Sequence, residues 1–449
     1  MVRIFTITFL LGLMITTNPL KSGVPGTLQF DLKGHGFEVV DVRWSPTGRK
    51  IATADSYGKS AIIWDAESGS KLFTLRHNGD VRAVSWSPDG SKIATASWDS
   101  TAKIWDANTG TLIHTLKGHT NSLVDIKWSP DGTKIATACQ DHTARIWDAI
   151  KGETIVTLKG HTSFVWDVKW SPDGTKLATA SWDYSTKIWD VNTGINLHTL
   201  KGHTSYLRTV NWSPDGTKVA TASSDRTSKI WNVNSGTIIH TLKAHKQDVI
   251  TVSWSPDGTK VVTGSCDDTA RIWNASNGLL IHTLKGHNNC VWDAAWSPDG
   301  TKIATASYDN TLKIWAVNSG ATLYTLSGHR ELVYAVSWSP DGSKVASGSG
   351  DQTAKIWFVT EGTAVQEEIT QPLTQFSISP NPAHGSFTAS FEQASLLPTE
   401  LHITNLLGQT VATASIPSGV SEWRMMTDGL PAGMYVVRCG SWVRSLVVY

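Results

Sequence analysis

The chain has 449 residues, of which 40% are hydrophobic and 17% charged, and its formal net charge is +1 at pH 7. This length predicts two or more folded units of a globular protein. Lys and Asp residues are interleaved and leave no basic stripe, so we expect no nucleic-acid partner. Four cysteines are too few to build a disulfide framework in a chain of this length.

Residues 1–23 are predicted to form a secretory signal peptide. Arg3 precedes an apolar run from Ile4 to Ile15, and polar residues and Pro19 follow the run. The run is too short to span a bilayer, which favours a signal peptide. An uncleaved membrane anchor or a buried strand is the alternative, and the sequence marks no clear cleavage site.

Residues 26–359 contain one unit that is repeated eight times. A histidine recurs every 42 residues, a tryptophan follows nine residues after each histidine, and a second tryptophan series closes the units. Self-similarity at a fixed period is the signature of a repeat architecture. The three series are His35, His77, His119, His161, His203, His245, His287 and His329; Trp44, Trp86, Trp128, Trp170, Trp212, Trp254, Trp296 and Trp338; and Trp64, Trp105, Trp147, Trp189, Trp231, Trp273, Trp315 and Trp357.

Each unit is predicted to form four short strands. In one unit the strands cover residues 165–170, 176–181, 186–189 and 195–200. The Ser-Pro-Asp-Gly sequence between the first two supplies the dihedral angles of a hairpin turn. Alternating apolar and small polar residues are typical of strands. Evenly spaced short strands with a period of 42 residues favour a β-propeller over a sandwich or a barrel.

The units resemble the WD-repeat family. Gly-His occurs in six of them, Trp-Asp in four and Trp-Asn in two, all in register. The resemblance covers residues 26–359 and implies an all-β, eight-bladed propeller, whose ring is closed by a strand at residues 27–32 that completes the last blade. A seven-bladed ring is the alternative, because the first repeat is the poorest copy and has no Asp in its second turn (Tyr57, Gly58).

The resemblance also implies a structural role for the periodic histidines. Within each blade a His, a Ser or Thr hydroxyl, an Asp and a Trp would form a chain of hydrogen bonds; in the unit of His161 the hydroxyl would be that of Ser181 or Thr179. Because the same set recurs in every blade, architecture is favoured over catalysis. Cys139 replaces the Ser of the third repeat and is expected to weaken the network there. The predicted network residues are His119, His161, His203, His245, His287 and His329 together with Asp99, Asp141, Asp183, Asp225, Asp267, Asp309 and Asp351.

No metal, cofactor or catalytic residue is predicted. No nucleophile elbow, Gly-rich phosphate loop or carboxylate pair stands outside the repeat, and we expect no cluster of carboxylates or histidines at channel-facing positions. A second set of histidines lacks further ligands of the kind that zinc requires, so these residues are predicted to be solvated on the outer strands. They are His114, His198, His240 and His282.

Three positions of the repeat vary in chemistry, and they predict a partner-binding face. They lie three and five residues after each periodic histidine and directly before the turn Asp. The resemblance implies that these positions face one end of the ring and contact partners, and Trp, Tyr and Arg dominate binding hot spots. Alternatively, these aromatic residues merely cover the rim. The predicted partner-binding residues are Arg82, Trp98, Phe164, Trp166, Trp182, Tyr206, Arg208, Trp292, Tyr308 and Tyr334.

Two further features belong to the same end of the repeat. The aliphatic residues four and seven after each histidine are separated by an odd step, which predicts a β-bulge between them. Cys266 and Cys290 occupy neighbouring repeats at positions on the same ring face. An oxidising compartment would allow a disulfide there, although a disulfide tolerates only a narrow separation of the two Cα atoms.

Residues 376–449 are predicted to form a second β unit after a linker at residues 360–375. Strands with period-2 alternation, broken by Gly and Pro, predict a small immunoglobulin-like β-sandwich. The ordered motifs Pro380-Asn-Pro382, Asn405-x-x-Gly-Gln409 and Leu430-Pro-Ala-Gly-x-Tyr435 resemble the C-terminal sorting domain of the type IX (Por) secretion system of Bacteroidetes. The resemblance implies export by that machinery, removal of the domain and attachment to surface lipopolysaccharide. An ordinary adhesive sandwich is the alternative.

The sequence therefore predicts a secreted or cell-surface protein of a Gram-negative bacterium that acts as a non-catalytic scaffold. Its propeller would bind a protein, peptide or glycan. The alternative is a secreted propeller enzyme, a hydrolase or lyase, with its active site at the central channel.

Overall fold

The computed structural model describes residues 23–359, 376–379, 385–391, 399–405, 410–417, 420–427, 429–439 and 442–448. Residues 1–22 of the predicted signal peptide, the linker at 360–375, and the motif residues Pro380–Pro382, Gly408 and Gln409 lie outside this description. The chain divides into two compact units, Met1–Gly362 and Thr363–Tyr449. Every regular element in the described residues is a β-strand.

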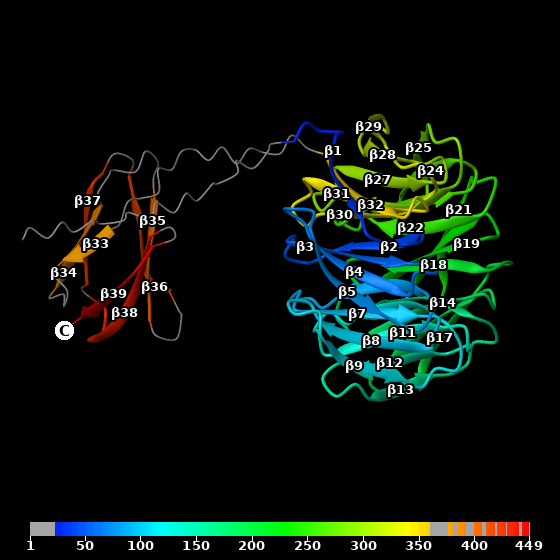
Figure 1. Ribbon diagram of the computed structural model, residues 1–449, viewed down its shortest axis with the longest axis horizontal. Coiled ribbons are helices and arrows are strands. Elements are labelled where there is room, and N and C mark those ends of the chain that lie inside the picture. The colour runs from blue at the N-terminus through cyan, green and yellow to red at the C-terminus, as the bar shows by residue number, and fades with distance from the viewer. Residues whose placement is uncertain are drawn as a thin grey trace, which may run out of the picture. The chain divides into compact units, whose positions relative to one another are not determined.

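The first unit consists of eight four-stranded antiparallel sheets arranged in a ring, one sheet per blade (Figure 1). Blades 1 to 8 follow the chain. Their inner strands are β2 (Val39–Trp44), β6 (Val81–Trp86), β10 (Leu123–Trp128), β14 (Val165–Trp170), β18 (Leu207–Trp212), β22 (Val249–Trp254), β26 (Val291–Trp296) and β30 (Val333–Trp338). Their second strands are β3 (Lys50–Asp55), β7 (Lys92–Ser97), β11 (Lys134–Cys139), β15 (Lys176–Ser181), β19 (Lys218–Ser223), β23 (Lys260–Ser265), β27 (Lys302–Ser307) and β31 (Lys344–Ser349).

The remaining two strands of each blade lie farther from the channel. The third strands are β4 (Ser60–Asp65), β8 (Thr101–Asp106), β12 (Ala144–Asp148), β16 (Ser185–Asp190), β20 (Thr227–Asn232), β24 (Thr269–Asn274), β28 (Thr311–Ala316) and β32 (Thr353–Phe358). The outer strands are β5 (Lys71–Arg76), β9 (Leu112–Lys117), β13 (Thr154–Leu158), β17 (Asn196–Lys201), β21 (Ile238–Lys243), β25 (Leu280–Lys285), β29 (Thr322–Ser327) and, for blade 8, β1 (Leu28–Lys33).

The ring is closed by strands from its two ends. β1 pairs antiparallel with β32, so that Leu32 lies opposite Ala354 and the N-terminal strand completes the last blade. The inner strands β2 and β30 also pack against each other. Because the ring is closed, the first and last blades pack against each other and neither leaves an open end. The predicted eight-bladed propeller is confirmed, and the seven-bladed alternative is wrong because the first repeat forms a complete blade.

The core of the propeller lies between the blades. The second strands are buried on both faces; in β15, Ala178 and Ala180 have no exposed surface. These two small residues of blade 4 pack in one cluster with larger residues of blade 5, including Val210, Trp212 and Trp231. Small side chains on one sheet therefore let the next sheet approach closely, and burial of this apolar surface favours the closed ring.

The second unit contains two antiparallel sheets. One has the order β33 (Phe376–Ser379), β34 (Ser386–Phe391), β37 (Glu422–Met426), and the other has the order β36 (Thr410–Ile416), β35 (Thr399–Thr404), β38 (Gly433–Cys439), β39 (Trp442–Val448). Phe387 of the first sheet packs in one buried cluster with Leu401, Ile403 and Val437 of the second. Two sheets around a shared apolar core are consistent with the predicted small sandwich.

Candidate functional site

A β-bulge in every inner strand shapes the surface around the central channel. In blade 4 the register between β14 and β15 shifts between Val165 and Asp167, and the same shift occurs at the equivalent residues of all eight blades. This agrees with the bulge predicted from the spacing of the aliphatic residues. A bulge changes the direction of the side chains beside it. Trp166 and Asp167 both line the channel cavity as a result.

The largest aromatic cluster lies where blade 4 meets blade 5. Trp182 stacks on Trp166 with ring centroids 4.7 Å apart, and its centroid is 5.3 Å from Phe164 and 5.0 Å from Tyr206. The guanidinium of Arg208 lies 5.9 Å from the Trp182 ring centroid. Five of the predicted partner-binding residues, from two blades, therefore form one continuous surface.

A second aromatic cluster joins blades 7 and 8. Trp292 stacks on Tyr308 at a centroid distance of 4.7 Å, and the ring of Tyr334 meets that of Tyr308 edge-on at 5.5 Å. Burial raises the pKa of Tyr334 to about 12, so its hydroxyl stays protonated at neutral pH. Arg82 and Trp98 of blade 2 form a separate pair at 5.2 Å. The ten predicted residues thus form three groups.

A disulfide lies between the two aromatic clusters. Cys266, directly before the turn of blade 6, is bonded to Cys290 at the start of blade 7, 24 residues later. The backbone oxygen of Cys290 accepts a hydrogen bond from the N–H of Tyr308 at 2.9 Å. The disulfide therefore links blades 6 and 7 covalently, and Cys290 is hydrogen-bonded to Tyr308 of the second aromatic cluster.

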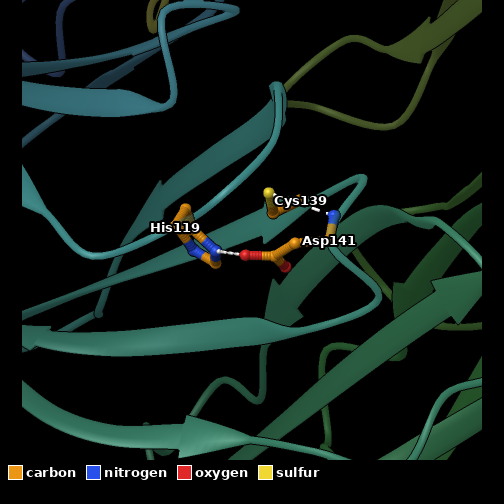
Figure 2. A group of neighbouring side chains, drawn as sticks. All are labelled: His119, Cys139 and Asp141. Atoms are coloured by element: carbon orange, nitrogen blue, oxygen red, sulfur yellow. Dashed lines mark hydrogen bonds and ion pairs between the residues drawn. The ribbon is translucent and has the colours of Figure 1, made fainter.

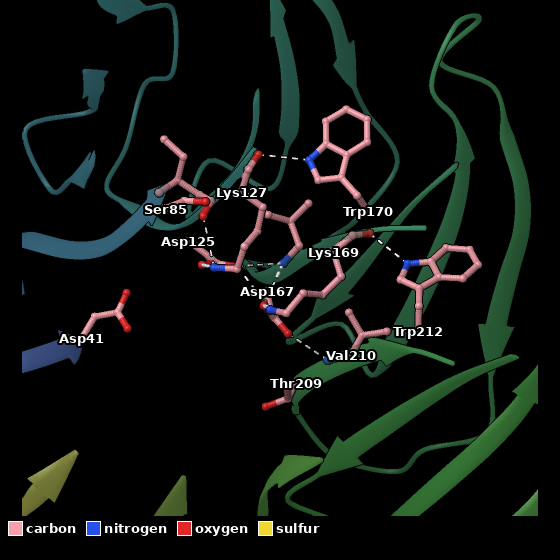
Figure 3. A network of polar contacts seen from close by, with 12 residues as sticks. Asp41, Ser85, Asp125, Lys127, Asp167, Lys169, Trp170, Thr209, Val210 and Trp212 are labelled. Carbon is pink, nitrogen blue, oxygen red and sulfur yellow. Dashed lines mark hydrogen bonds and ion pairs between the residues drawn. The ribbon is translucent and has the colours of Figure 1, made fainter. Parts of the chain in front are cut away.

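Charged side chains line the channel below the aromatic residues, which corrects the expectation that no carboxylates gather there. They occupy the positions six and eight residues after the periodic histidines, and Figure 3 shows those of blades 3 and 4 together with Asp41 of blade 1. Because side chains alternate along a strand, both positions face the channel. The charged residues at these two positions are Asp41, Arg43, Asp125, Lys127, Asp167, Lys169 and Asp293, and Arg208 of the aromatic cluster also lines the channel.

Most of these carboxylates connect neighbouring blades. Asp167 accepts a hydrogen bond from the backbone N–H of Val210 in the next blade at 2.9 Å, and Asp41 accepts one from Val84 at 3.0 Å. Asp125 and Asp167 also form ion pairs with Lys127 and Lys169 on their own strands. Buried charges are tolerated when they are paired and hydrogen-bonded in this way.

Asp125 and Asp167 lie side by side and titrate differently. Burial raises the pKa of Asp167 to about 6 against the lowering effect of Lys169, and the neighbouring carboxylate of Asp125 adds to this increase. Burial acts on Asp125 too, but the charges of Lys127 and Lys169 hold the pKa of its carboxyl below the usual range. The pKa values of two close carboxyl groups commonly differ in this way, because ionisation of one group disfavours ionisation of the other.

Each blade contains the hydrogen-bonded chain that the sequence suggested, and of the two candidate hydroxyls in blade 4, Ser181 and Thr179, the chain runs through Thr179. In blade 4, His161 Nδ1 contacts Asp183 at 2.7 Å and Nε2 contacts Thr179 Oγ1 at 2.8 Å. The indole N–H of Trp189 donates to the same hydroxyl at 2.9 Å. Ser181 instead donates to a loop carbonyl and accepts the N–H of Asp183. In the other predicted blades, the pairs are His119–Asp141, His203–Asp225, His245–Asp267, His287–Asp309 and His329–Asp351.

The two least regular blades keep the same chain. In blade 2, His77 contacts Asp99 at 3.2 Å although the preceding Gly is missing. In blade 1, His35 contacts Asp55 at 2.9 Å. Asp55 stands at the end of β3, where the other blades have Ser or Cys, so its carboxylate replaces the absent turn Asp.

His119, Cys139 and Asp141 form the group of described residues whose ligand atoms are close enough for a metal ion (Figure 2). Cys139 Sγ donates to Asn121 O at 3.1 Å and accepts from the N–H of Asp141 at 3.3 Å, the two bonds that Ser makes elsewhere. Burial raises the pKa of the Cys139 thiol to about 12, and a neutral thiol is a poor metal ligand. The expected weakening of this network is therefore not seen in its hydrogen bonds.

Three of the four second histidines differ from the prediction that they are solvated. His114 is half-buried, and its Nε2 contacts Ile150 O of the next blade at 2.7 Å. His240 and His282 make the same contact in later blades. A hydrogen bond across the blade boundary gives these residues a structural role at the end opposite the aromatic clusters.

Comparison with known families identifies the first unit. The model described as WD domain, G-beta repeat matches residues 26–65, 69–106, 110–148, 152–190, 194–232, 236–274, 278–316 and 320–357. These matches cover more than half of the chain. The chain belongs to the WD-repeat family. Residues 377–447 match the secretion system C-terminal sorting domain, which indicates export to the cell surface or secretion of this WD-repeat protein.

Relatives of known name share only part of the WD-repeat protein. WD repeat-containing protein 1 of Bos taurus is 33% identical over 105 residues, which are 22% of this chain and 17% of the relative. Nuclear distribution protein PAC1 of Arthroderma benhamiae is 34% identical over 112 residues, 22% of this chain and 24% of the relative. The matches thus span a quarter or less of the length of the relatives.

No helix within the described residues is long and apolar enough to cross a membrane.

Proposed function

We propose that this secreted or cell-surface scaffold binds a protein or peptide through its aromatic rim. The aromatic rim consists of the two clusters at blades 4–5 and 7–8: Phe164, Trp166, Trp182, Tyr206, Arg208, Trp292, Tyr308 and Tyr334. The observation that carries the proposal is the continuous stack on Trp182, which spans two blades. Rigid aromatic side chains and Arg supply most of the energy at protein interfaces.

The variation between repeats supports this assignment. The eight repeats keep almost the same residues in the blade interior, whereas the rim positions change from Trp to Arg to Asp. Positions that only hold the ring together have no need to differ between blades. A glycan is the alternative ligand, and binding to an array of purified oligosaccharides in place of a protein would favour it.

We infer that the protein is not an enzyme. The channel carboxylates accept backbone N–H groups of the next blade, and three of them pair with basic residues on their own strands. These contacts account for the charges without a reaction. A hydrolase or lyase with a channel site is the competing proposal, and loss of turnover in Asp167→Asn for any substrate would support it.

In this proposal both ends of the chain serve to export the protein. Residues 1–23 act as a signal peptide, and the C-terminal unit directs passage through the type IX machinery of a Bacteroidetes-type bacterium. The C-terminal unit is then removed, and the propeller is attached to surface lipopolysaccharide. Intact-mass spectrometry of the surface or secreted form should find neither end. Recovery of intact Tyr449 at the cell surface would contradict removal of the sorting domain.

Substitution at the rim tests the binding proposal. A partner is first captured from the outer-membrane and extracellular fractions, identified and purified. Trp166→Ala, Trp182→Ala and Trp292→Ala should each weaken its binding by about 1–3 kcal/mol, the usual range for hot-spot residues. Calorimetric titration measures the effect, and circular dichroism verifies that the variants fold.

Ile195→Ala is the matched control for these variants. Ile195 belongs to blade 4, is 60% exposed, and lies at the end with the Ser-Pro-Asp-Gly turns. Its substitution should leave the affinity unchanged. If the three Trp variants bind normally and Ile195→Ala does not, the binding face has been assigned to the wrong end of the ring.

A further inference from the structure

Acidic and basic residues occur together in the channel wall, with one exception. In blades 1, 3 and 4 an Asp six residues after the histidine is followed two residues later by Arg43, Lys127 or Lys169. In blades 2, 5, 6 and 8 both positions are uncharged. Blade 7 alone has the acid without the base, since Asp293 is followed by Ala295.

This difference leaves Asp293 without a basic residue on its own strand. Burial raises the pKa of Asp293, and the guanidinium of Arg43, which lies more than 4.0 Å away, opposes this increase. Arg43 lies 3.0 Å from Asp41, and Lys127 and Lys169 are paired with Asp125 and Asp167. No Lys, Arg or His nitrogen in the part of the chain that the structure describes lies within 4.0 Å of Asp293. Arg208 also lines the cavity, but it pairs with Asp248 at 3.7 Å. Of the four channel carboxylates in the described residues, Asp293 is therefore the one that forms no ion pair within 4.0 Å.

The existing contacts of Asp293 leave room for a ligand. Its Oδ1 accepts the N–H of Ala294 at 2.9 Å and its Oδ2 accepts the N–H of Val336 at 3.1 Å. A carboxylate offers about four acceptor sites, so each oxygen can accept a further hydrogen bond. Asp293 is only half-buried and lines the open cavity, so a ligand can reach these oxygens from the channel.

Aromatic rings stand beside this carboxylate. Trp292 and Tyr334 line the same cavity, with their centroids 6.4 Å apart and their planes nearly perpendicular. The cavity has a volume of about 330 Å³, roughly ten times the 30 Å³ share of a water molecule. Ring faces attract cations, and this attraction adds to that of a carboxylate. A carboxylate without an ion pair, in the same cavity as these aromatic rings, therefore favours a positively charged organic group.

We propose that Asp293, Trp292 and Tyr334 form a subsite for the side chain of a lysine or arginine of the bound partner. The ammonium or guanidinium group of the partner would pair with Asp293, as the Lys or Arg equivalent to Ala295 pairs with the Asp in blades 1, 3 and 4. This inference rests on the proposed function, because the side chain comes from a polypeptide that lies on the aromatic rim.

Short capped peptides test the charge requirement on the full-length protein. Isothermal titration compares acetyl-Gly-Arg-Gly-amide and acetyl-Gly-Lys-Gly-amide with the citrulline peptide, which has nearly the shape of the arginine peptide but no charge. We expect the arginine or lysine peptide to bind at least tenfold more tightly than the citrulline peptide. Putrescine should bind more weakly than the better peptide, because the occupant is a polypeptide side chain. Equal affinities in either comparison would overturn the proposal.

Two variants at blade 7 separate charge from shape. Ala295→Lys recreates the Asp-x-Lys sequence that blades 3 and 4 already contain, so the fold should accept it. It should reduce peptide affinity at least tenfold, and Asp293→Asn should do the same. Ala295→Met is the matched control, since it adds a side chain of similar length without charge, and it should retain most of the affinity.

The variants also distinguish this inference from the proposed function. If Trp182→Ala weakens binding of the purified partner while Ala295→Lys and Ala295→Met affect the peptide equally, the rim binds the partner and the Asp293 subsite is wrong. If neither Trp182→Ala nor Ala295→Lys changes the affinity for the purified partner, both the proposed function and the Asp293 subsite are wrong. Circular dichroism and thermal unfolding confirm that each variant keeps the wild-type fold.

Discussion

The blade interior and the surface around the channel are built from the same eight repeats, and they tolerate variation very differently. The interior keeps a His, a hydroxyl, a carboxylate and a Trp in all eight blades, even where the carboxylate must come from Asp55. The channel and rim positions change in charge and size from blade to blade. A buried polar chain is stable only when every member is satisfied, whereas a surface position can change at little cost.

Acidification should affect the interior most. Burial lowers the pKa of six network histidines below the usual 6.5, against the raising effect of their Asp partners. Such a histidine binds its proton mainly in the unfolded chain, so the free energy of unfolding falls as the pH drops through about 6.5. Each contributes at most about 1.4 kcal/mol per pH unit. The six are His77, His119, His161, His203, His245 and His329.

Thermal unfolding between about pH 8 and pH 5 measures this effect, and Tm should decrease on acidification. Two channel carboxyl groups oppose it, because burial raises the pKa of Asp167 to about 6 and also raises that of Asp293. At these residues the folded state gains protons as the pH falls. Asp167→Asn removes one of these opposing contributions and should steepen the decrease. A Tm that rises toward pH 5 would contradict the assignment of the histidines.

Blade 2 offers a direct comparison of the two regions with one residue type. Trp105 is 6% exposed and donates to Thr95 at 2.9 Å, whereas Trp98 is 37% exposed on the rim. Trp105→Ala should lower the free energy of unfolding by about 3–5 kcal/mol, the range for a buried aromatic residue. Trp98→Ala should cost about 1 kcal/mol or less, mainly its contact with Arg82. Urea denaturation followed by circular dichroism measures both, and equal losses would abolish the distinction.

The disulfide at the rim should contribute to the free energy of unfolding by an amount similar to that of a buried interior residue. Cys266 and Cys290 are separated by 24 residues, and closing a loop of this length stabilises a fold by roughly 3 kcal/mol through the unfolded chain. We expect the double variant Cys266→Ser/Cys290→Ser to lose about that amount in denaturation by urea. Under reducing conditions the wild type should match the variant. A wild type that is unaffected by reduction would show that the bond does not stabilise the fold.

Cys139→Ser should have the smallest effect. It restores the residue of the other repeats, and the thiol already makes both hydrogen bonds of that serine. The change in free energy of unfolding should stay within about 0.5 kcal/mol. A gain of more than about 1 kcal/mol would mean that the cysteine does weaken blade 3, as its departure from the repeat first suggested.

Much of the fold follows from the sequence because the repeat aligns the same signals eight times. The His and Trp series count the blades, the Ser-Pro-Asp-Gly turns separate the first two strands, and the step between Val165 and Val168 predicts the bulge. The residues of the aromatic rim were also found, because their chemistry varies against a constant background. The sequence left the hydroxyl of the chain open between Ser181 and Thr179, which lie two residues apart on the same strand, and the structure selects Thr179.

The channel charges were missed for a different reason. Asp125, Lys127, Asp167 and Lys169 alternate with aliphatic residues, so their common face was visible in the pattern. Their grouping was not, because residues 42 positions apart meet only when the ring closes. The grouping of Trp182 with Tyr206 across a blade boundary depends on closure in the same way.

The sequence by itself determined the number of blades, their strands and their internal hydrogen-bonding residues, because those interactions lie within about 42 residues and recur. The tertiary structure decided which blade lies beside which around the channel, and thereby that Lys169 lies 3.6 Å from Asp125 of the neighbouring blade. Electrostatic interactions depend on distance in space. Closure of the ring by β1 and β32 fixes those distances, and no local pattern in the sequence contains them.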